Sequence, residues 1–424
     1  MPGHSLLNQR GNDVDAGTRS LNGLSWLTFL IAAMQAGFGP FVAVRLTEAG
    51  WTDASIGLVL SASTVAAMVA QVPSGAVIDR LGSNRRLAAA AIVASVAALL
   101  LLVAAPLFGL VLAAEIVQGG AGVGLAIAIA AITLSVARQD RLGERLGRNV
   151  RYGAMGAALG AGLFGLVGSL VAGRAVFLLA AACGPPALLA LRAIGPEDLA
   201  QAKLRTGHHT APPPHRRRGR PVPALRLLRD RRLLALLGVA ALFQLGNASL
   251  LPLAAGSFAR QTGRHADLIT AAAVTVPQLL TALLSPRVGL WAQTHGRRIV
   301  LMLGLVALPL RGLAFAASPS VAITFAAQTL DGVSAASFGV LLPLIVADIT
   351  HRGGRFNLAL GMTGLAGGLG ATLSTALAGR IADMAGLPAA FLALAAVGCG
   401  AVLTVWVFLP ETAHLPVAHQ EHHA

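Results

Sequence analysis

Long apolar runs recur along the whole chain, and most of them are about 20 residues long, the length at which a helix crosses the hydrocarbon core of a bilayer. The runs are rich in Ala, Leu and Gly and lack the alternation of apolar and polar residues seen in the shorter strands of membrane barrels. The sequence therefore predicts an all-α polytopic membrane protein with twelve transmembrane helices. The predicted spans cover 24–44, 55–78, 87–106, 109–136, 153–172, 175–194, 233–255, 267–292, 299–317, 321–347, 357–379 and 387–409.

The composition excludes two other classes of protein. Only 12% of the residues are charged, whereas a soluble globular protein carries about 25%. With 55% hydrophobic residues the chain is also too apolar to stay disordered in water. The net charge of +15 does not indicate a nucleic-acid partner, because the cations lie in short clusters between apolar runs and aromatic residues make up only 4%. We therefore expect a lipid bilayer as partner and no nucleic acid.

The basic residues indicate how the spans are oriented. One set of alternating loops holds 23 of the 32 Lys and Arg residues, whereas the opposite loops hold five. Positively charged loops stay in the cytoplasm, so both termini are expected there. Residues 1–20 are polar and lead directly into the first span, unlike a cleavable signal peptide. These features predict a multi-pass protein of a bacterial-type inner membrane, which we expect to be a monomer.

A basic linker divides the chain into six spans and six. Residues 195–232 are rich in Pro, Arg and His and cannot form a hydrophobic core. The predicted organisation is a cytoplasmic N-terminal tail (1–20), an N-terminal six-helix bundle (21–194), the linker (195–232), a C-terminal six-helix bundle (233–410) and a cytoplasmic tail that contains histidines (411–424).

Several markers repeat between the two halves, which predicts that the bundles are pseudo-symmetric. The segment GAVIDRLGSNRR, which begins at Gly75, returns 214 residues later as GLWAQTHGRR. At an offset of about 213, Glu115, Gln118 and Gly119 correspond to Gln328, Asp331 and Gly332. At an offset of 208, Gly153, Gly156, Gly160 and Gly162 are aligned with Gly361, Gly364, Gly368 and Gly370. Pro196-Glu197 and Pro410-Glu411 follow the sixth and twelfth spans.

The loop after the second span carries the most specific motif. It reads Gly75-xxx-Asp79-Arg80-x-Gly82-xx-Arg85-Arg86, and it resembles the loop signature of the major facilitator superfamily (MFS) of secondary transporters. The resemblance covers nearly the whole chain, through the twelve spans, the six-plus-six division and the basic central loop. It implies two bundles around a central cavity, with access alternating as one half rocks against the other.

The resemblance also implies a gate at the cytoplasmic side. Asp79 would face the N-terminal end of the eleventh span, around Asn357, where the helix dipole stabilises an anion by about 0.3–1 kcal/mol. The second copy has Gln293 and Thr294 where the acid and base would stand, so charge gating is expected mainly from the first copy. For Arg85 and Arg86 a role as topology signals stays open. The candidate gating residues are Gly75, Asp79, Arg80, Gly82, Arg85, Arg86, Gly289, Gly296, Arg297 and Arg298.

Among the charged residues inside predicted spans, Glu115, Arg311 and Asp331 are the candidates for ion coupling. In the family this part of the fourth span often reads Arg-xx-Gln-Gly, and that Arg is associated with proton coupling, but here Glu115 stands in its place. A charge there costs about 2.5–3.5 kcal/mol on insertion scales, so we expect Glu115 to face the cavity and to carry a proton part of the time. Asp331 and Arg311 either form a structural pair, or Asp331 or Glu115 is the titrating site and Arg311 favours its charged form or contacts an anion.

Neutral polar residues give further cavity candidates. By analogy with the family, the first, fourth, seventh and tenth spans line the cavity, which favours Gln35, Gln118, Gln244, Asn247 and Gln328. The alternative for each is an interhelical hydrogen bond worth about 0.6 kcal/mol. A weakly polar cavity with few aromatic rings disfavours sugars and suits amphipathic solutes.

No enzyme, nucleotide-binding or catalytic-metal motif is visible, so we expect no cofactor. The C-terminal histidines fit a solvated tail better than a metal site. The predicted function is secondary active transport of small organic solutes, driven by protons or another coupling ion, with a slight preference for efflux. The alternatives are an uptake symporter of the same fold and a membrane sensor or scaffold that does not transport.

Overall fold

The computed structural model describes residues 3–38, 40–81, 84–104, 106–170, 173–195, 227–254, 266–318, 320–351 and 355–413, the side chains of 3–18, 40, 53, 81, 139, 169, 173, 266–272 and 321 excepted. Helices account for almost all of these residues. In the first half they are α1 (Gly3–Gln35), α2 (Pro40–Glu48), α3 (Asp53–Leu81), α4 (Asn84–Ala104), α5 (Phe108–Val136), α6 (Leu142–Leu170), α7 (Gly173–Ala182) and α8 (Gly184–Arg192), with a 3-10 turn η1 (Gln139–Arg141) before α6. In the second half they are α11 (Arg231–Asn247), α13 (Ala266–Thr294), α14 (Arg297–Ala317), α15 (Val321–Thr350), α16 (Phe356–Ala385) and α17 (Leu387–Phe408).

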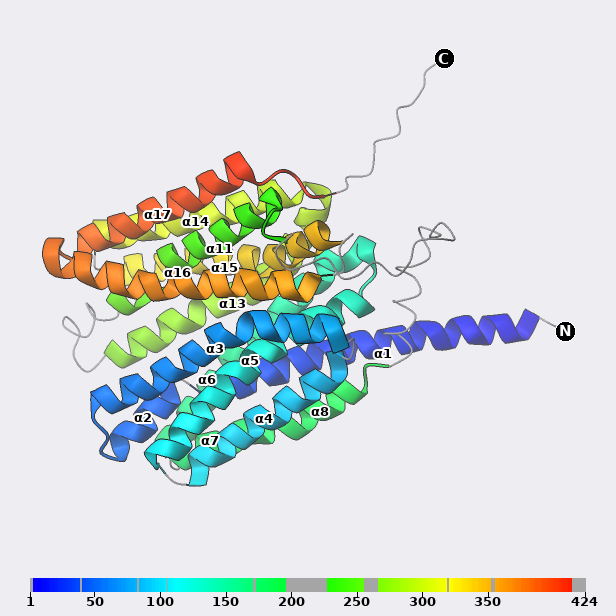
Figure 1. Ribbon diagram of the computed structural model, residues 1–424, viewed down its shortest axis with the longest axis horizontal. Helices are drawn as coiled ribbons and strands as arrows, with labels where there is room; N and C mark the ends of the chain where they lie inside the picture. Colours follow the sequence, from blue (N-terminus) through cyan, green and yellow to red (C-terminus); the bar gives the residue numbers. More distant parts are fainter. Residues whose placement is uncertain are drawn as a thin grey trace, which may run out of the picture.

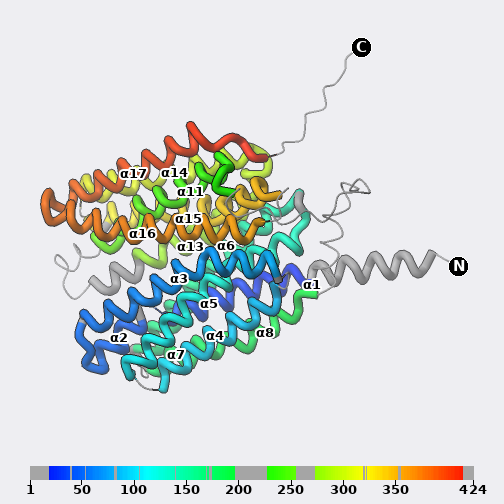
Figure 2. Tube along the Cα trace, in the orientation of Figure 1, coloured from blue at the N-terminus to red at the C-terminus, as the bar shows by residue number. Residues whose placement is uncertain are grey.

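The helices form two bundles that lie side by side (Figures 1 and 2). Each bundle has its own hydrophobic core, which includes Leu99 and Phe177 in the first and Phe243 and Leu344 in the second. The bundles meet mainly along two helix pairs, α3 with α16 and α6 with α13. Within the described residues, ten helices are long and apolar enough to cross a membrane. The two further predicted spans correspond to α1 with α2 and to α13, which gives the twelve-helix arrangement expected from the sequence.

Three predicted spans are interrupted: the span expected at 233–255 has a turn at 248–249, and two others are each divided into two named helices. The span expected at 24–44 is divided between α1, which already begins at Gly3 within the segment expected as a tail, and α2. At the break, a Cβ on Gly37 would lie 2.7 Å from the Cβ of Ala180 on α7, so only glycine allows this approach. The span expected at 175–194 is interrupted at Cys183, and α8 begins with a Gly-Pro-Pro segment because proline suits the first turn of a helix.

The fifth predicted span begins 11 residues too late, at 153 instead of 142. Arg145, Arg148 and Arg151, expected in a loop, lie in the first turns of α6. These turns are stable because they are amphipathic: Leu142 and Leu146 are buried, and the Arg148 guanidinium lies 2.6 Å from the Glu144 carboxylate one turn earlier.

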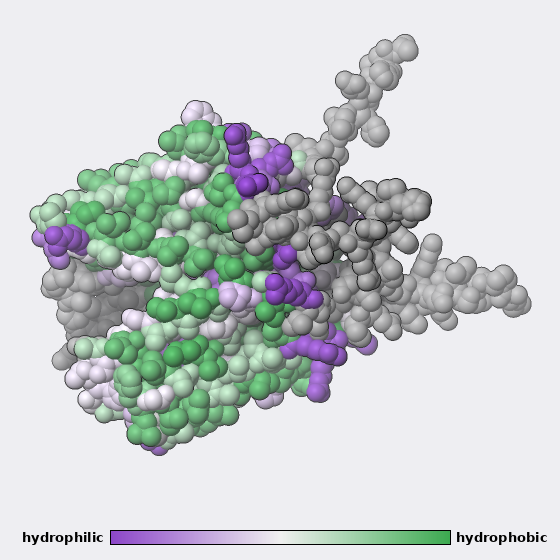
Figure 3. All heavy atoms as spheres, viewed as in Figure 1, coloured by the Kyte–Doolittle hydropathy of each residue, from purple (hydrophilic) through white to green (hydrophobic). Residues whose placement is uncertain are grey.

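The two halves touch at one end and part at the other. A Cβ on Gly75 of α3 or on Gly361 of α16 would collide with backbone atoms of the opposite half. Near the other ends of the same helices, a Cβ on Gly57 or Gly379 would meet nothing within 4 Å. Figure 3 shows the surface hollowed between the halves at this second end, whereas hydrophilic side chains gather at the first. We call the first end, where Arg80, Arg141 and Arg298 lie, the basic end. The structure is therefore closed at the basic end and open at the opposite end.

Candidate functional site

Arg311 of α14 lies at the centre of a polar network in the second half and is only 1% exposed. Its Nη1 donates to Oδ1 of Asp331 and to Oδ1 of Asn247, each at 2.6 Å. Its Nη2 donates to Oε1 of Gln328 at 2.7 Å, and the amide of Gln328 donates to the backbone oxygen of Ala273 at 2.5 Å. The network thus joins α11, α13, α14 and α15.

The pairing of Arg311 with Asp331 was one of two open expectations, and it is observed. The Asp331 side chain stays 19% exposed while that of Arg311 is almost fully buried, so the pair reaches the surface only on its acidic side. Taking two charges out of water is costly, and their attraction repays that cost only with good geometry and further hydrogen bonds. Asn247 and Gln328 supply those hydrogen bonds.

Glu115 of α5 has no comparable partner in the first half. It is 2% exposed, and its side chain interacts with that of Ser63 on α3. Its Oε1 is buried without a hydrogen-bond partner, and no cation forms an ion pair with it in the part of the chain that the structure describes. Glu115 is thus a buried carboxyl group that has no countercharge among the described residues. Sequence reasoning missed Ser63, because a serine in an apolar helix gives no signal of which neighbour it faces.

The remaining cavity candidates either form hydrogen bonds between helices or, like Gln244, make a packing contact. The Gln118 amide donates to Oε1 of Gln35 at 3.1 Å, which joins α5 to α1, and the buried Oε1 of Gln118 has no partner. Gln244 packs against Gly367 of α16. The interhelical hydrogen bond considered for each of these residues is therefore present for Gln35, Gln118, Asn247 and Gln328.

Close helix contacts fix the register of the internal repeat. A Cβ on Gly119 would collide with the backbone oxygen of Ser63. A Cβ on Gly332 would lie 2.9 Å from the backbone oxygen of Pro277. Because these are equivalent close contacts in the two halves, they confirm the offset of about 213 in this region.

The offset of 208 for the glycines of α6 and α16 is wrong. A Cβ on Gly147 would collide with the oxygen of Ser285, and one on Gly361 with that of Gln71, so Gly147 and Gly361 are equivalent at an offset of 214. Glycines are frequent in both helices, and several alignments therefore looked alike in the sequence.

Asp79 lies at the end of α3 against the N-terminus of α16, as the resemblance implied. Its Oδ1 accepts from the backbone N–H of Asn357 at 3.3 Å and from the Asn357 amide at 2.8 Å, and its Oδ2 accepts from the Leu358 N–H at 3.0 Å. Gly75, one turn earlier, allows this approach because any Cβ there would collide with the Asn357 carbonyl. The carboxylate therefore occupies the anion-binding end of α16 and links the two halves.

The other members of the first motif do not join this link. Arg80 and Arg86 are exposed, Arg85 is half-buried, and none of the three forms an ion pair with a described residue. Gly82 lies outside the described residues. For these arginines the role as topology signals stays open.

The second copy of the motif forms the other contact between the halves. Gly289 of α13 packs against the backbone of Gly143 of α6 so closely that neither could carry a Cβ without a collision. Gln293 occupies the position that Asp79 has in the first copy, and its Nε2 donates to the Asp140 carbonyl at 2.7 Å. The Arg151 guanidinium adds a hydrogen bond to the Ala282 carbonyl at 2.9 Å.

Gly296, Arg297 and Arg298 instead stabilise the second half internally. Gly296 has a positive φ of 94° before α14. The Glu411 carboxylate accepts from the backbone N–H groups of Arg297 and Arg298 at 2.8 and 3.1 Å, and the Arg297 side chain pairs with Asp348 at 3.1 Å. Asp348 and Glu411 were not predicted as site residues, although the repeated Pro-Glu pair was a signal for Glu411.

Among the described residues, no group of three or more His, Cys, Asp and Glu side chains could hold a metal ion. The C-terminal histidines lie outside the described residues.

Solved structures with the same fold include the E. coli fucose:proton symporter, with a TM-score of 0.68 at 14% identity, covering 91% of this chain and 97% of its own. The human organic anion transporter MFSD10 is similar with a TM-score of 0.68 at 17% identity, covering 92% of this chain and 99% of its own. These likenesses show the fold alone.

Sequence comparison is more specific. An uncharacterised MFS-type transporter of Mycobacterium tuberculosis is 32% identical over 408 residues, covering 95% of this chain and 96% of its own. Multidrug resistance protein 2 of Bacillus subtilis is 32% identical over 149 residues, which is 35% of this chain and 36% of its own. The family model described as Major Facilitator Superfamily matches residues 24–272 and 236–423. This multi-pass membrane protein therefore belongs to the major facilitator superfamily of transporters.

Proposed function

We propose that this protein is a proton-coupled secondary transporter of small organic solutes that works by alternating access and favours efflux. In this proposal the halves 21–194 and 233–410 move against each other around the linker 195–232. The basic loops face the cytoplasm together with both termini, and the membrane is the inner membrane of a bacterial-type cell. A single chain contains both halves and acts as a monomer.

The observation that carries the proposal is the buried Glu115 carboxyl group without a countercharge. An ionised carboxylate inside a transmembrane helix costs about 2.5–3.5 kcal/mol on insertion scales. A proton on Glu115 removes that cost, and a conformational change that exposes the carboxyl group to water would release the proton. Asp331 is the less suitable carrier, because Arg311 at 2.6 Å already compensates its charge.

Alternating access is supported by the asymmetry between the two ends. The Asp79 link and the contact between α6 and α13 close the basic end, while the opposite end is hollowed. A transporter needs the reverse arrangement as well. We infer that opening the basic end breaks the hydrogen bonds of Asp79 and Gln293 across the two helix pairs.

The solute class follows from the weakly polar side chains between the helices. Gln35, Gln118, Gln244, Asn247 and Gln328 are neutral, and Asp331 adds one partly exposed carboxylate. Such a lining suits amphipathic organic solutes better than sugars. The partial similarity to Multidrug resistance protein 2 supports the preference for efflux.

The test uses purified protein in proteoliposomes, with a solute chosen because it raises the melting temperature of the detergent-solubilised protein. Glu115→Gln should abolish accumulation driven by a proton gradient but leave counterflow exchange, which needs no gradient. Glu48→Gln, which changes an exposed glutamate at the end of α2, is the matched control. Unchanged proton-driven flux in both Glu115→Gln and Asp331→Asn would contradict the coupling role.

The same preparation separates the two alternatives. An inward proton current that depends on the solute would identify an uptake symporter. A sensor or scaffold would instead lose its function when residues 203–220 are deleted and would tolerate changes at Glu115 and Asp331.

A further inference from the structure

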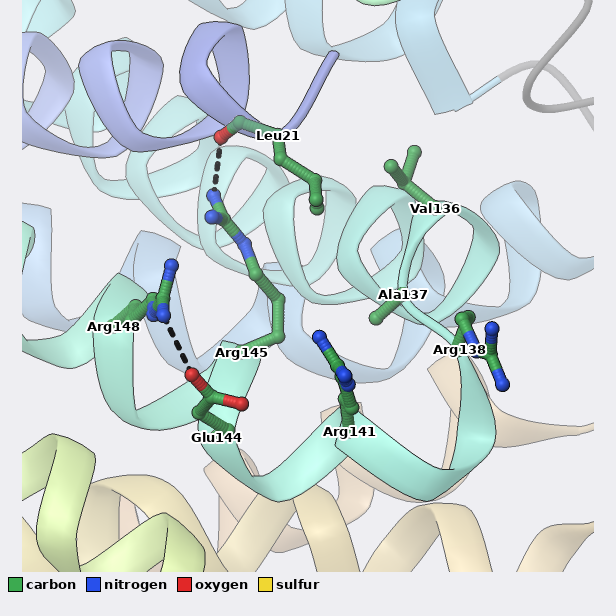
Figure 4. Close-up of a pocket in the computed structure, with 8 residues that line it drawn as sticks. All are labelled: Leu21, Val136, Ala137, Arg138, Arg141, Glu144, Arg145 and Arg148. Atoms are coloured by element: carbon green, nitrogen blue, oxygen red, sulfur yellow. Dashed lines mark hydrogen bonds and ion pairs between the residues drawn. The ribbon is translucent and has the colours of Figure 1, made fainter. Parts of the chain in front are cut away.

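A basic pocket lies at the closed end of the first half, where the end of α5, the turn η1 and the start of α6 meet α1 (Figure 4). Its volume is about 160 Å³, far more than a single water molecule needs. Four arginines line it, Arg138, Arg141, Arg145 and Arg148, against a single acid, Glu144. Nothing in the transport cycle described above uses this pocket.

The charges of the lining are only partly compensated. Arg138 bonds to Asp140 at 3.1 and 3.2 Å, and this hydrogen bond lowers the pKa of the Asp140 carboxyl. Arg148 pairs with Glu144 at 2.6 Å, so these two opposite charges partly compensate each other. Arg141 is exposed and forms no ion pair with a described residue.

Arg145 supplies a second cation that is built into the pocket. It is 6% exposed, and its Nη2 donates to the Leu21 carbonyl at 2.8 Å and to the Ser25 hydroxyl at 3.0 Å. Both bonds are to neutral groups, and within the part of the chain that the structure describes the buried Nε has no hydrogen-bond partner. The guanidinium therefore lies in the pocket wall without an ion-pair partner among the described residues, next to the positive N-terminal end of the long helix α6.

The opposite wall is apolar. Leu21, Val136 and Ala137 lie beside the arginines in Figure 4. An anion that fits must therefore present several oxygens to guanidinium groups and carry an organic substituent beside them. Phosphate esters have this chemistry, and arginine is the side chain best suited to bind them.

We propose that this pocket binds the phosphate group of a phosphate ester. Arg141 and Arg145 hold the phosphate oxygens, and the substituent lies against Leu21 and Val136. The ester comes either from an anionic phospholipid headgroup of the adjacent leaflet or from a soluble cytoplasmic compound. Binding does not require transport, so this proposal can fail while the proposed function stands, and the reverse is also possible.

The experiment measures the melting temperature of the full-length protein in neutral detergent with three probes: phosphatidylglycerol, phosphatidylcholine and inorganic phosphate. Arg141→Gln is the test variant, because Arg145 also holds α1 and its loss would disturb folding. Arg229→Gln removes an exposed arginine just before α11, outside the pocket, and is the matched control.

We expect phosphatidylglycerol to stabilise the wild type and the Arg229→Gln variant at the same concentration. Arg141→Gln should need about tenfold more lipid, the effect of losing one charge-assisted hydrogen bond. If inorganic phosphate gives the same Arg141-dependent shift and lipid gives none, the source is soluble. The proposal is overturned if neither anionic probe depends on Arg141, or if phosphatidylcholine stabilises as well as phosphatidylglycerol.

Discussion

In the first half, Gln118 of α5 bonds directly to Gln35 of α1, whereas at the equivalent depth of the second half Asp331 of α15 reaches Asn247 of α11 only through Arg311. The corresponding turn of α4, residues 97–99, is Ala-Ala-Leu and offers no cation. The repeat has therefore kept the positions of the polar groups and changed their charges.

This difference indicates different roles for the acidic residues Asp331 and Glu115 of the two halves. A proton added to Asp331 would leave Arg311 buried and uncompensated, which is costly. A proton added to Glu115 leaves no such partner behind. The second half therefore holds a fixed charge pair, and the first half holds the buried carboxyl group whose charge can change at the lower cost.

The largest expected effect comes from breaking the fixed pair. Asp331→Ala should lower the free energy of unfolding by about 3–5 kcal/mol, because it leaves the Arg311 guanidinium buried without its counterion. Glu115→Gln should change it by less than about 1 kcal/mol, since the amide has the same shape and carries no charge. Denaturant unfolding of the purified proteins in mixed micelles measures both.

A double variant is the control for this prediction. Arg311→Met combined with Asp331→Leu removes both charges and should recover most of the lost stability. If Glu115→Gln destabilises as much as Asp331→Ala, then the two acids are equally dependent on partners and the proposed contrast between the halves is wrong.

The second prediction compares the two contacts between the halves. Asp79→Asn replaces a carboxylate that accepts three hydrogen bonds at a helix N-terminus, and it should weaken the closed state by about 1.5–3 kcal/mol. Gln293→Ala removes one neutral hydrogen bond and should cost about 1 kcal/mol. Distances between spin labels at Arg86 and His351, both exposed at the basic end, report the opening.

The order of these two effects is the decisive result. If Gln293→Ala opens the basic end as readily as Asp79→Asn, the charge of the first copy contributes nothing special. Equal populations in all three proteins would show that neither contact controls the closed state.

The third prediction concerns close packing and not charge. Gly75→Ala and Gly289→Ala should each destabilise the closed state by about 1–3 kcal/mol, because the new Cβ meets backbone atoms that cannot move easily. Gly57→Ala, on the same helix as Gly75, should have no such effect, since nothing lies within 4 Å of its Cβ position. The same spin-label distances serve as the measurement, and an equal response at Gly57 would contradict the packing explanation.

Several of these features were accessible from the sequence. Apolar runs of bilayer length indicated the spans, and the family motif indicated that Asp79 meets the start of α16. The Arg311 network was only half predicted, because spacing along one helix does not tell which neighbouring helix a side chain faces. The break at Gly37 and the early start of α6 were missed for a related reason. Both depend on contacts with other helices, namely Ala180 of α7 and the buried faces of Leu142 and Leu146.

The smallest expected effect concerns the hydrogen bond between the neutral side chains of Gln35 and Gln118, which joins two helices of the first half. A double-mutant cycle with Gln35→Ala and Gln118→Ala should give a coupling free energy of about 0.6 kcal/mol, typical of a hydrogen bond between membrane helices. The equivalent cycle with Asn247→Ala and Arg311→Met should give a larger value, because that bond involves a charge. If the two couplings are equal, Arg311 contributes no more than a neutral donor would, and the charge difference between the halves has no energetic consequence at this depth.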